Sequence, residues 1–339
     1  MMRRCAGWLP LLAAMAGTLP MAWGANAPAA GPAAAATPAE VHILPVQGNI
    51  FMLVGAGGNI TVQTGSDGVL LVDTGLAPMS DKVLAAVRTL SDKPIRYIID
   101  THVHADHVGG NEAIAKAGAT IAGGNVVGDI GSSASNQATI IAFQSVLDRM
   151  STPPAGTAAA PQGAWPTDTY TTPERKIFFN DEGVQLIHEP AAHTDGDTMV
   201  FFRRSDVIST GDIFVTNGYP IVDLEHGGNI QGVIAGLNRI VELAIPADEQ
   251  EGGTLIIPGH GRLCDVADVV YYQEMVIIIR DRIQDLINKG MSLEQVKAAQ
   301  PTRDYDPRYG SSTGNWTTDK FVTAVYKSLS GLGSKHESQ

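Results

Sequence analysis

The chain has 339 residues, a formal net charge of −12 and 44% hydrophobic residues, enough for one large or two medium domains with a proper core. The negative charge argues against a nucleic acid or an acidic membrane surface as the partner. Only two cysteines occur, Cys5 and Cys264, and we expect the segment that holds Cys5 to be removed. The mature chain would then have one thiol and no internal disulfide.

The N-terminus has the pattern of a secretory signal. Arg3 and Arg4 precede an apolar run, and small residues allow cleavage after Gly24 or after Ala27. The run is too short, and too interrupted by proline, to span a membrane as a helix. We therefore predict a signal peptide over residues 1–24, a flexible Ala/Pro/Gly-rich linker over 25–39 and a periplasmic or secreted catalytic domain over 40–330.

The first half of this domain begins with strand-like segments separated by turn residues, which predicts an antiparallel meander. Apolar residues at helical spacing and buried apolar runs predict the elements that follow. In chain order, we expect strands at 41–47, 50–54, 59–64 and 69–73, a helix at 78–90, a strand at 95–100, a helix at about 112–117, a strand at 119–122 and a helix at 137–150.

A long loop, rich in proline, alanine, threonine and glycine, is expected over residues 151–172. Its Trp165 is either a lid residue over an apolar substrate or a packed surface aromatic. After it we expect strands at 176–179, 184–189, 199–203, 206–210 and 254–257 and helices at 230–243, 266–287, 292–299 and 318–328. Strands followed by helices, twice over, predict an α/β fold with two β-rich halves and helices outside, an αβ/βα sandwich.

Residues 101–111, with the sequence Thr-His-Val-His-Ala-Asp-His-Val-Gly-Gly-Asn, place three histidines and an aspartate within six positions. These are His102, His104, Asp106 and His107, on a predicted strand-to-helix loop where α/β folds carry chemistry. Imidazole and carboxylate groups are ligands that suit zinc and related metals. The stretch therefore predicts a metal site.

Three further candidate ligands, His193, Asp212 and His260, each follow a predicted strand. Strand ends on one side of a sheet can converge on one pocket. Each residue is weak evidence alone, but their order behind the upstream motif favours one shared metal site. Among the other histidines, His226 is the strongest candidate for an additional role because of its loop position.

Together with Leu-Val-Asp-Thr-Gly at 71–75, these motifs make residues 41–262 resemble the metallo-β-lactamase superfamily. The resemblance implies a four-layer αβ/βα sandwich with the site at the edge between two sheets. It also implies that Asp73 orients ligands without binding metal itself. The implied zinc sites are a first formed by His102, His104 and His193, and a second formed by Asp106, His107 and His260, with Asp212 bridging the two.

This ligand set predicts two zinc ions per chain, with Asp106 and Asp212 as the charge-compensating carboxylates of the catalytic centre. Zinc lowers the pKa of bound water to about 7, so we expect a metal-bridging hydroxide to attack the carbonyl of a small-molecule substrate. Export fits a β-lactam, which is met outside the cytoplasm. We therefore predict a secreted β-lactamase-like hydrolase that opens a cyclic amide or ester.

Two alternatives stay open. Zinc β-lactamases typically carry cysteine or serine at the position of Asp212, and an aspartate there resembles lactonases and thioesterases of the glyoxalase II type. Such lactonases often have a tyrosine three residues later, where this chain has Val215, with Tyr219 the nearest. The 101–107 stretch also resembles iron-dependent persulfide dioxygenases. Residues 217–229 either line the substrate pocket or connect to the helix expected at 230.

Overall fold

The computed structural model describes residues 40–120, 137–153 and 158–331, which all belong to one compact unit. The predicted signal peptide at 1–24 and linker at 25–39 lie outside the described residues, as does the second half of the strand predicted at 119–122. Across the described ranges, the structure contains no helix that is both long and apolar enough to cross a membrane.

The first sheet has seven strands, arranged in space in the order of the chain. The predicted meander is confirmed, because its first four strands pair antiparallel, and the last four pair parallel. The strands are β1 (His42–Gln47), β2 (Ile50–Val54), β3 (Ile60–Thr64), β4 (Val69–Val72), β5 (Ile95–Ile99), β6 (Thr139–Phe143) and β7 (Asp168–Tyr170). The accompanying helices are η1 (Ala77–Met79), α1 (Ser80–Leu90), α2 (Ala105–Val108), α3 (Asn111–Lys116), α4 (Gln144–Ser151) and η2 (Gln162–Ala164).

The second sheet has five strands in the order β12-β11-β10-β9-β8, antiparallel except for the parallel pair of β11 and β12. Its strands are β8 (Glu174–Phe179), β9 (Glu182–His188), β10 (Thr198–Phe202), β11 (Val207–Ser209) and β12 (Leu255–Ile257). The helices of this half are η3 (Gly211–Ile213), η4 (Leu224–His226), α5 (Ile230–Leu243), α6 (Val266–Asn288), α7 (Leu293–Ala298), α8 (Asp306–Tyr309) and α9 (Thr318–Leu329).

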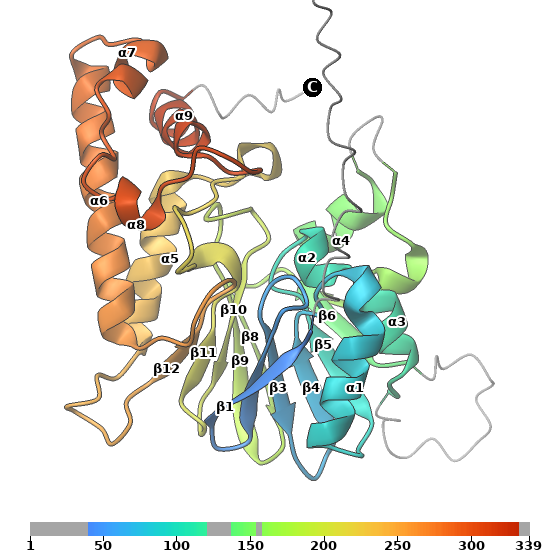
Figure 1. The fold of residues 1–339 in the computed structure, drawn as a ribbon. Helices are drawn as coiled ribbons and strands as arrows, with labels where there is room; N and C mark the ends of the chain where they lie inside the picture. Colours follow the sequence, from blue (N-terminus) through green and yellow to red (C-terminus); the bar gives the residue numbers. More distant parts are fainter. Residues whose placement is uncertain (1–39, 121–136, 154–157, 332–339) are drawn as a thin grey trace, which may run out of the picture. The chain divides into compact units, whose positions relative to one another are not determined.

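Side-chain alternation along the strands builds the four layers. Leu71 packs in the cluster that includes α1 and α3, whereas its neighbour Leu70 lies in the cluster between the sheets. In the second sheet, Phe201 packs with α5 and α6, and Phe202 faces the first sheet. Figure 1 shows these helices on the outer flanks of the two sheets. The predicted αβ/βα sandwich is therefore confirmed.

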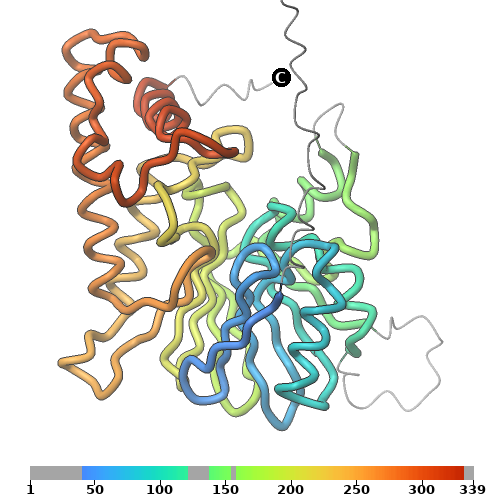
Figure 2. The backbone as a smooth tube through the Cα atoms, viewed as in Figure 1, coloured from blue at the N-terminus to red at the C-terminus, as the bar shows by residue number. Residues whose placement is uncertain are grey.

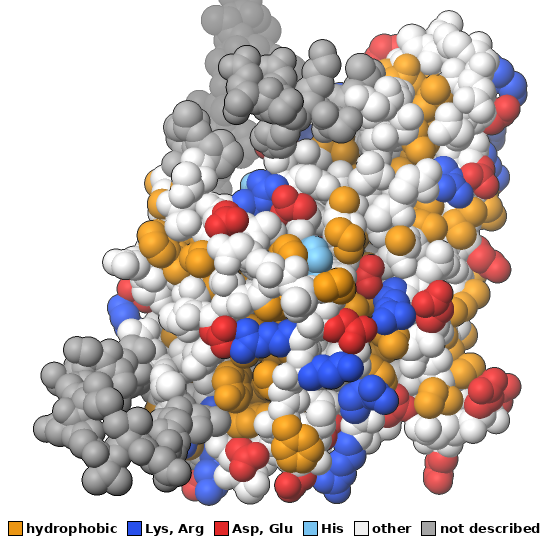
Figure 3. Space-filling view, turned by 180° about the vertical axis from the view of Figure 1, so that it is seen from behind, with side chains coloured by type: hydrophobic (Ala, Val, Ile, Leu, Met, Phe, Trp, Pro, Cys, Tyr) orange, Lys and Arg blue, Asp and Glu red, His pale blue; other side chains and the backbone are white. Residues whose placement is uncertain are grey.

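The surface is mixed in character. On the face shown in Figure 3, acidic and basic side chains are interspersed with hydrophobic ones. This face is therefore not uniformly negative, because basic groups lie among the acidic ones.

The helix predicted over 137–150 is wrong in its first half. Residues 139–143 form β6, which pairs parallel with β5 and β7, and α4 begins only at Gln144. Ile140, Ile141 and Ala142 are buried consecutively, as in a strand that is covered on both faces. Periodicity cannot separate such a short apolar run from a buried helix segment, so tertiary pairing decides the outcome.

The long loop predicted over 151–172 is also partly wrong, because residues 168–170 form β7 at the edge of the first sheet. Trp165 packs beside a cluster that includes Val108 and Val146, and its indole N–H donates to the carbonyl of Ala160 at 2.9 Å. These contacts favour the packed aromatic over the lid for Trp165.

The interface between the sheets makes a testable prediction. Ile141 is fully buried there, so Ile141→Ala is expected to lower the free energy of unfolding by about 2–5 kcal/mol, through lost burial and a residual cavity. Phe178→Ala is the control, since Phe178 is 74% exposed and should change stability by less than about 0.5 kcal/mol. Chemical denaturation followed by circular dichroism measures both, and equal effects would contradict the assignment of β6 to the core.

Candidate metal centre

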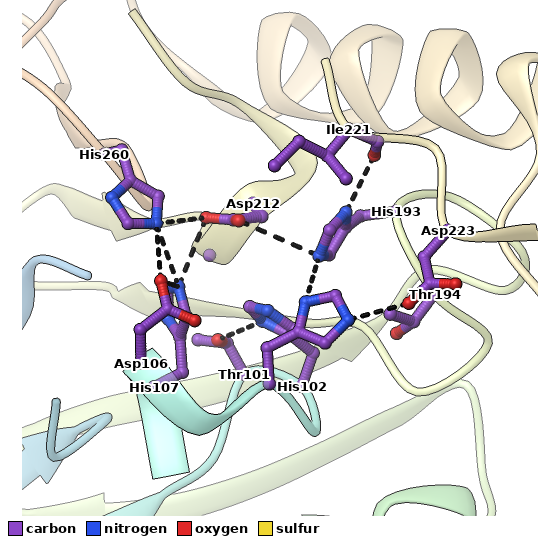
Figure 4. A network of polar contacts seen from close by, with 12 residues as sticks. Thr101, His102, Asp106, His107, His193, Thr194, Asp212, Ile221, Asp223 and His260 are labelled. Carbon is purple, nitrogen blue, oxygen red and sulfur yellow. Dashed lines mark hydrogen bonds and ion pairs between the residues drawn. The ribbon is translucent and has the colours of Figure 1, made fainter. Parts of the chain in front are cut away.

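Strand ends bring the candidate ligands to one edge of the two sheets. The parallel pair of β11 and β12 aligns Ser209 with Ile257, and each strand carries its ligand three residues further on, at Asp212 and His260. The other ligands come from the loop and helix that follow β5, and from the loop between β9 and β10. The structure brings all seven predicted residues into one cluster: His102, His104, Asp106, His107, His193, Asp212 and His260. Figure 4 shows this cluster with every one of them labelled except His104.

One end of the cluster consists of three imidazoles. His102, His104 and His193 each offer a ring nitrogen, and these atoms all lie within 4.8 Å of one another. Nε2 of His193 is 2.9 Å from Nδ1 of His104. The rings meet nearly edge to face, with interplanar angles of 77° to 88°. These three nitrogens could supply three of the four ligands of a zinc site.

The other end combines two imidazoles with a carboxylate. Nε2 of His260 lies 3.1 Å from Oδ2 of Asp106 and 3.4 Å from Nε2 of His107. Nε2 of His107 is 3.8 Å from the same carboxylate oxygen. This second group lies beside the first, because the rings of His102 and His107 are 4.2 Å apart between centroids.

Asp212 lies between the two groups, as Figure 4 shows. Its Oδ1 is 3.3 Å from Nε2 of His107 and 3.5 Å from Nε2 of His260, whereas its Oδ2 is 3.7 Å from Nε2 of His193. One carboxylate therefore faces ligands of both groups, each through a different oxygen.

The outer ring nitrogens are held by acceptors, which fixes the tautomers. Nδ1 of His193 donates to the carbonyl oxygen of Ile221 at 2.7 Å. Nε2 of His104 lies 2.7 Å from Oδ2 of Asp223, and Nδ1 of His107 lies 2.7 Å from Oδ2 of Asp73. Because the outer nitrogen carries the proton in a neutral ring, the inner nitrogen presents a lone pair.

His102 is held in the same way. Thr101 donates its hydroxyl hydrogen to Oδ2 of Asp73 at 2.8 Å, so its oxygen accepts from Nδ1 of His102 at 3.0 Å. The backbone N–H of Thr101 also donates to Asp73, at 2.8 Å. Asp73 thus orients His107 directly and His102 through Thr101, from behind the cluster.

The donor set fits divalent cations on two observations. The facing nitrogens of His104 and His193 are both lone-pair bearers at 2.9 Å, an arrangement that needs a cation between or beside them. Nε2 of His102 and Oδ1 of Asp212 are buried polar atoms without a hydrogen-bond partner among the described residues, which is costly unless something binds them. The first group would hold one ion and the second another, with Asp212 shared.

The protonation states favour ligation. Burial lowers the pKa of His193 to about 4 and holds that of His102 well below its usual range, so both rings are neutral at pH 7. Burial opposes ionisation of Asp212, but the neighbouring His107 outweighs it and keeps the pKa of Asp212 well below its usual range. His102 and His193 are thus neutral imidazoles and Asp212 is an ionised carboxylate, the forms that bind metal.

Two glycines let the chain approach the ligands closely. A Cβ atom at Gly259 would lie 2.0 Å from Oδ1 of Asp212, and one at Gly58 would lie 2.4 Å from the ring of His107. Any other residue at either position would displace a ligand. The ligands can therefore keep their positions only if these two residues are glycines.

Sequence reasoning missed the supporting acceptors. The sequence marks Asp223 only as part of the segment 217–229, yet its carboxylate holds His104 and also lies 2.5 Å from Nδ1 of His226. His226, singled out by its loop position, therefore belongs to the surroundings of the centre. The spacing of three residues between Asp223 and His226 was a weak signal, and nothing in the sequence marked the carbonyl of Ile221.

The chain belongs to the metallo-beta-lactamase superfamily, whose family model matches residues 53–260. A linear primary-alkylsulfatase from Pseudomonas sp. (strain ATCC 19151) is 25% identical over 297 residues, covering 78% of this chain and 54% of the relative. The structure of the stereoselective inverting sec-alkylsulfatase Pisa1 from Pseudomonas sp. matches with a TM-score of 0.58 and 15% identity, over 87% of this chain and 51% of that chain. A metallo-beta-lactamase from Pontibacter korlensis matches with a TM-score of 0.51 and 12% identity, over 70% of this chain and 99% of that one. This chain therefore spans about half the length of the two alkylsulfatases.

The close approach at Gly259 makes a testable prediction. In Gly259→Ala the new methyl group would overlap Oδ1 of Asp212 and lie 2.6 Å from the backbone of Gly211. The segment that carries Asp212 must then shift, so the variant is expected to bind fewer than about two zinc ions per chain. Gly183→Ala is the matched control, because the nearest atom to its Cβ, on Arg203, is 3.8 Å away. Elemental analysis after equilibration with zinc measures the content, and full occupancy in Gly259→Ala would contradict the assignment of Asp212 as a ligand.

The carboxylate behind the cluster makes a second prediction. Asp73→Asn removes the acceptor that holds His107 and Thr101, so zinc affinity is expected to fall by about 10- to 100-fold. Competition with a chromogenic chelator measures this affinity. Asp81→Asn, an exposed substitution in α1, serves as the control. An unchanged affinity in a folded Asp73→Asn protein would show that this carboxylate does not support the metal.

Proposed function

We propose that this protein is an exported zinc-dependent hydrolase of small molecules, with two ions per chain, that opens a cyclic amide or ester such as a β-lactam. The observation that carries the proposal is the single buried carboxylate, Asp212, set between two groups of imidazole ligands at 3.3 to 3.7 Å. Two divalent ions held there would supply water of lowered pKa and an electrophilic partner for the substrate oxygen.

The chain leaves one side of the centre open to a substrate. The side chains of His107 and His193 are fully buried, whereas those of His104, Asp106 and His260 are 27%, 37% and 23% exposed. Cavities adjoin this exposed side, one beside His104 and one beside Asp106 and His260. A substrate would approach the centre from this exposed side, because buried ligands close the opposite side to solvent.

Asp106 is the most exposed carboxylate of the centre. Burial opposes its ionisation, but a hydrogen bond from His260 and the charge of His107 hold its pKa below the usual range. It is therefore ionised at neutral pH and faces the cavity that Tyr219 also lines. We assign to Asp106 and Asp212 the negative charge that balances the metal ions.

The surroundings favour a cyclic amide over a lactone. Tyr219, the nearest tyrosine after Asp212, is buried, stacks on Phe321 and donates its hydroxyl hydrogen to Asp306 at 2.8 Å. Its hydroxyl is therefore committed to the fold. The position three residues after Asp212 carries Val215, which has no hydroxyl to offer.

A sulfate ester is the second candidate substrate. The relative named as a linear primary-alkylsulfatase aligns with 78% of this chain, whereas the family model matches residues 53–260. Hydrolysis of a sulfate ester would use the same open side of the centre. This candidate rests on that similarity, and the β-lactam on the predicted export.

The test is purified full-length protein of measured metal content, assayed against a penicillin, a cephalosporin, a carbapenem, a homoserine lactone, a thioester and octyl sulfate. We expect turnover of a cyclic amide that requires about two zinc ions and is abolished in Asp212→Asn. Turnover of octyl sulfate alone would establish the second candidate. Bound iron with oxygen consumption on a persulfide would refute hydrolysis in favour of oxidation.

Export is tested separately. N-terminal sequencing of protein recovered from the periplasm or the medium is expected to begin after Gly24 or Ala27, since small residues precede both positions. Protein that keeps residues 1–24 and stays inside the cell would contradict export and remove the main argument for a β-lactam.

A further inference from the structure

A groove of about 600 Å³ opens beside the metal centre, and His104 is one of its lining residues. One wall is the segment 221–225, which follows Asp212 in the chain. The other is the C-terminal segment that includes Trp316 and α9. In Figures 1 and 2 the red segment that leads into α9 approaches the yellow part of the chain that contains residues 221–225, with which it lines the groove.

The first wall is coupled to the metal ligands. The carbonyl of Ile221 accepts from His193, and the carboxylate of Asp223 holds His104. A molecule bound along this wall would therefore lie next to residues that hold two ligands of the first group. The groove is continuous with the centre, unlike the other large cavities, which are lined by residues away from it.

The lining of the groove is largely apolar. Ile221 and Leu224 contribute from the first wall, and Trp316 and Ala324 from the second. Trp316 and Ile221 also line the smaller cavity of about 290 Å³ beside Asp106 and His260. Trp316 thus lies between the two openings to the centre, where an apolar part of a substrate would contact it.

The groove is lined by two ammonium groups and two carboxylates, and the ammonium groups lie together on one helix. Lys320 and Lys327 lie two turns apart on the same face of α9, about 10 Å apart along its axis. Within residues 40–331 as described, neither has an ion-pair partner, although Lys320 donates to the carbonyl of Asn315 at 2.7 Å. Two carboxylates also line the groove, but Asp223 is engaged by His104 and His226, which leaves the exposed Glu225 against two ammonium groups.

We infer that the groove binds an amphiphilic anion, with an alkyl chain along Ile221, Leu224 and Trp316 and a carboxylate or sulfate group at Lys320 and Lys327. As a statement about the substrate it rests on the proposed hydrolase function, whereas as a statement about binding it stands on the groove alone. The second wall lies beyond residues 53–260, so the part shared with the superfamily does not supply it. Substrate preference would therefore be set by the C-terminal segment.

The charge is tested by calorimetric binding of octanoate, octyl sulfate and octanol to the metal-loaded full-length protein. In the double variant Lys320→Gln, Lys327→Gln we expect affinity for the anions to fall roughly five- to tenfold and affinity for octanol to stay unchanged. Lys289→Gln, an exposed lysine paired with Asp285 on α6, is the control and should change nothing. Unchanged anion binding in the double variant would overturn the inference.

The same experiment separates the two anions and the apolar part. A loss confined to octyl sulfate assigns the lysines to sulfate, and a loss confined to octanoate assigns them to carboxylate. Trp316→Ala should weaken all three ligands, and each added methylene should strengthen wild-type binding by up to about fourfold. Affinity that is independent of chain length would refute the apolar groove.

Failure of the inference and failure of the proposed function give different results. Selective binding of octyl anions without hydrolysis of any panel compound would leave the groove standing and remove the hydrolase proposal. Hydrolysis of a panel compound without binding of any octyl ligand would support the hydrolase proposal and refute the groove. Metal content measured in every variant, expected to match wild type, excludes an indirect effect through the centre.

Discussion

The carboxylate of Asp73 is the contact on which the centre depends. It accepts three hydrogen bonds from the motif after β5: the backbone N–H and the hydroxyl of Thr101, and Nδ1 of His107. Asp73 has a φ of 65°, a left-handed conformation that is costly for a residue other than glycine. Its buried side chain holds two ligands in place, and β4 and β5 pair parallel directly beneath it.

A second constraint is electrostatic. Asp212 is buried between the two ligand groups, 3.3 to 3.7 Å from imidazole nitrogens of both. Such a site is unfavourable as a purely polar cluster, because facing lone pairs repel and a buried carboxylate lacks full solvation. The fold tolerates this local cost because the rest of the molecule supplies large apolar clusters on both outer faces and between the sheets.

The sequence was sufficient to predict those parts of the fold and of the metal centre that local patterns encode. The motif 101–111 and the ligands at strand ends could be found because each combines an unusual side chain with a strand boundary. The β6 strand could not, since its consecutive apolar residues fit a buried helix equally well until their pairing with β5 is known. The acceptor role of Asp223 and the groove wall at α9 depend on contacts across 119 and about 100 positions of chain, which no local pattern records.

The origin of the ligands has a consequence for folding. His102, His104, Asp106 and His107 belong to the half built on the first sheet, while His193, Asp212 and His260 belong to the half built on the second. Metal ions bound by ligands from both halves would therefore link the two halves to each other. Because such ions bind the native chain and not the unfolded one, metal supply and conformational stability become linked quantities. The protein would be least resistant to unfolding and proteolysis wherever the metal is scarce, so metal availability would govern how long the chain survives as well as whether it can act.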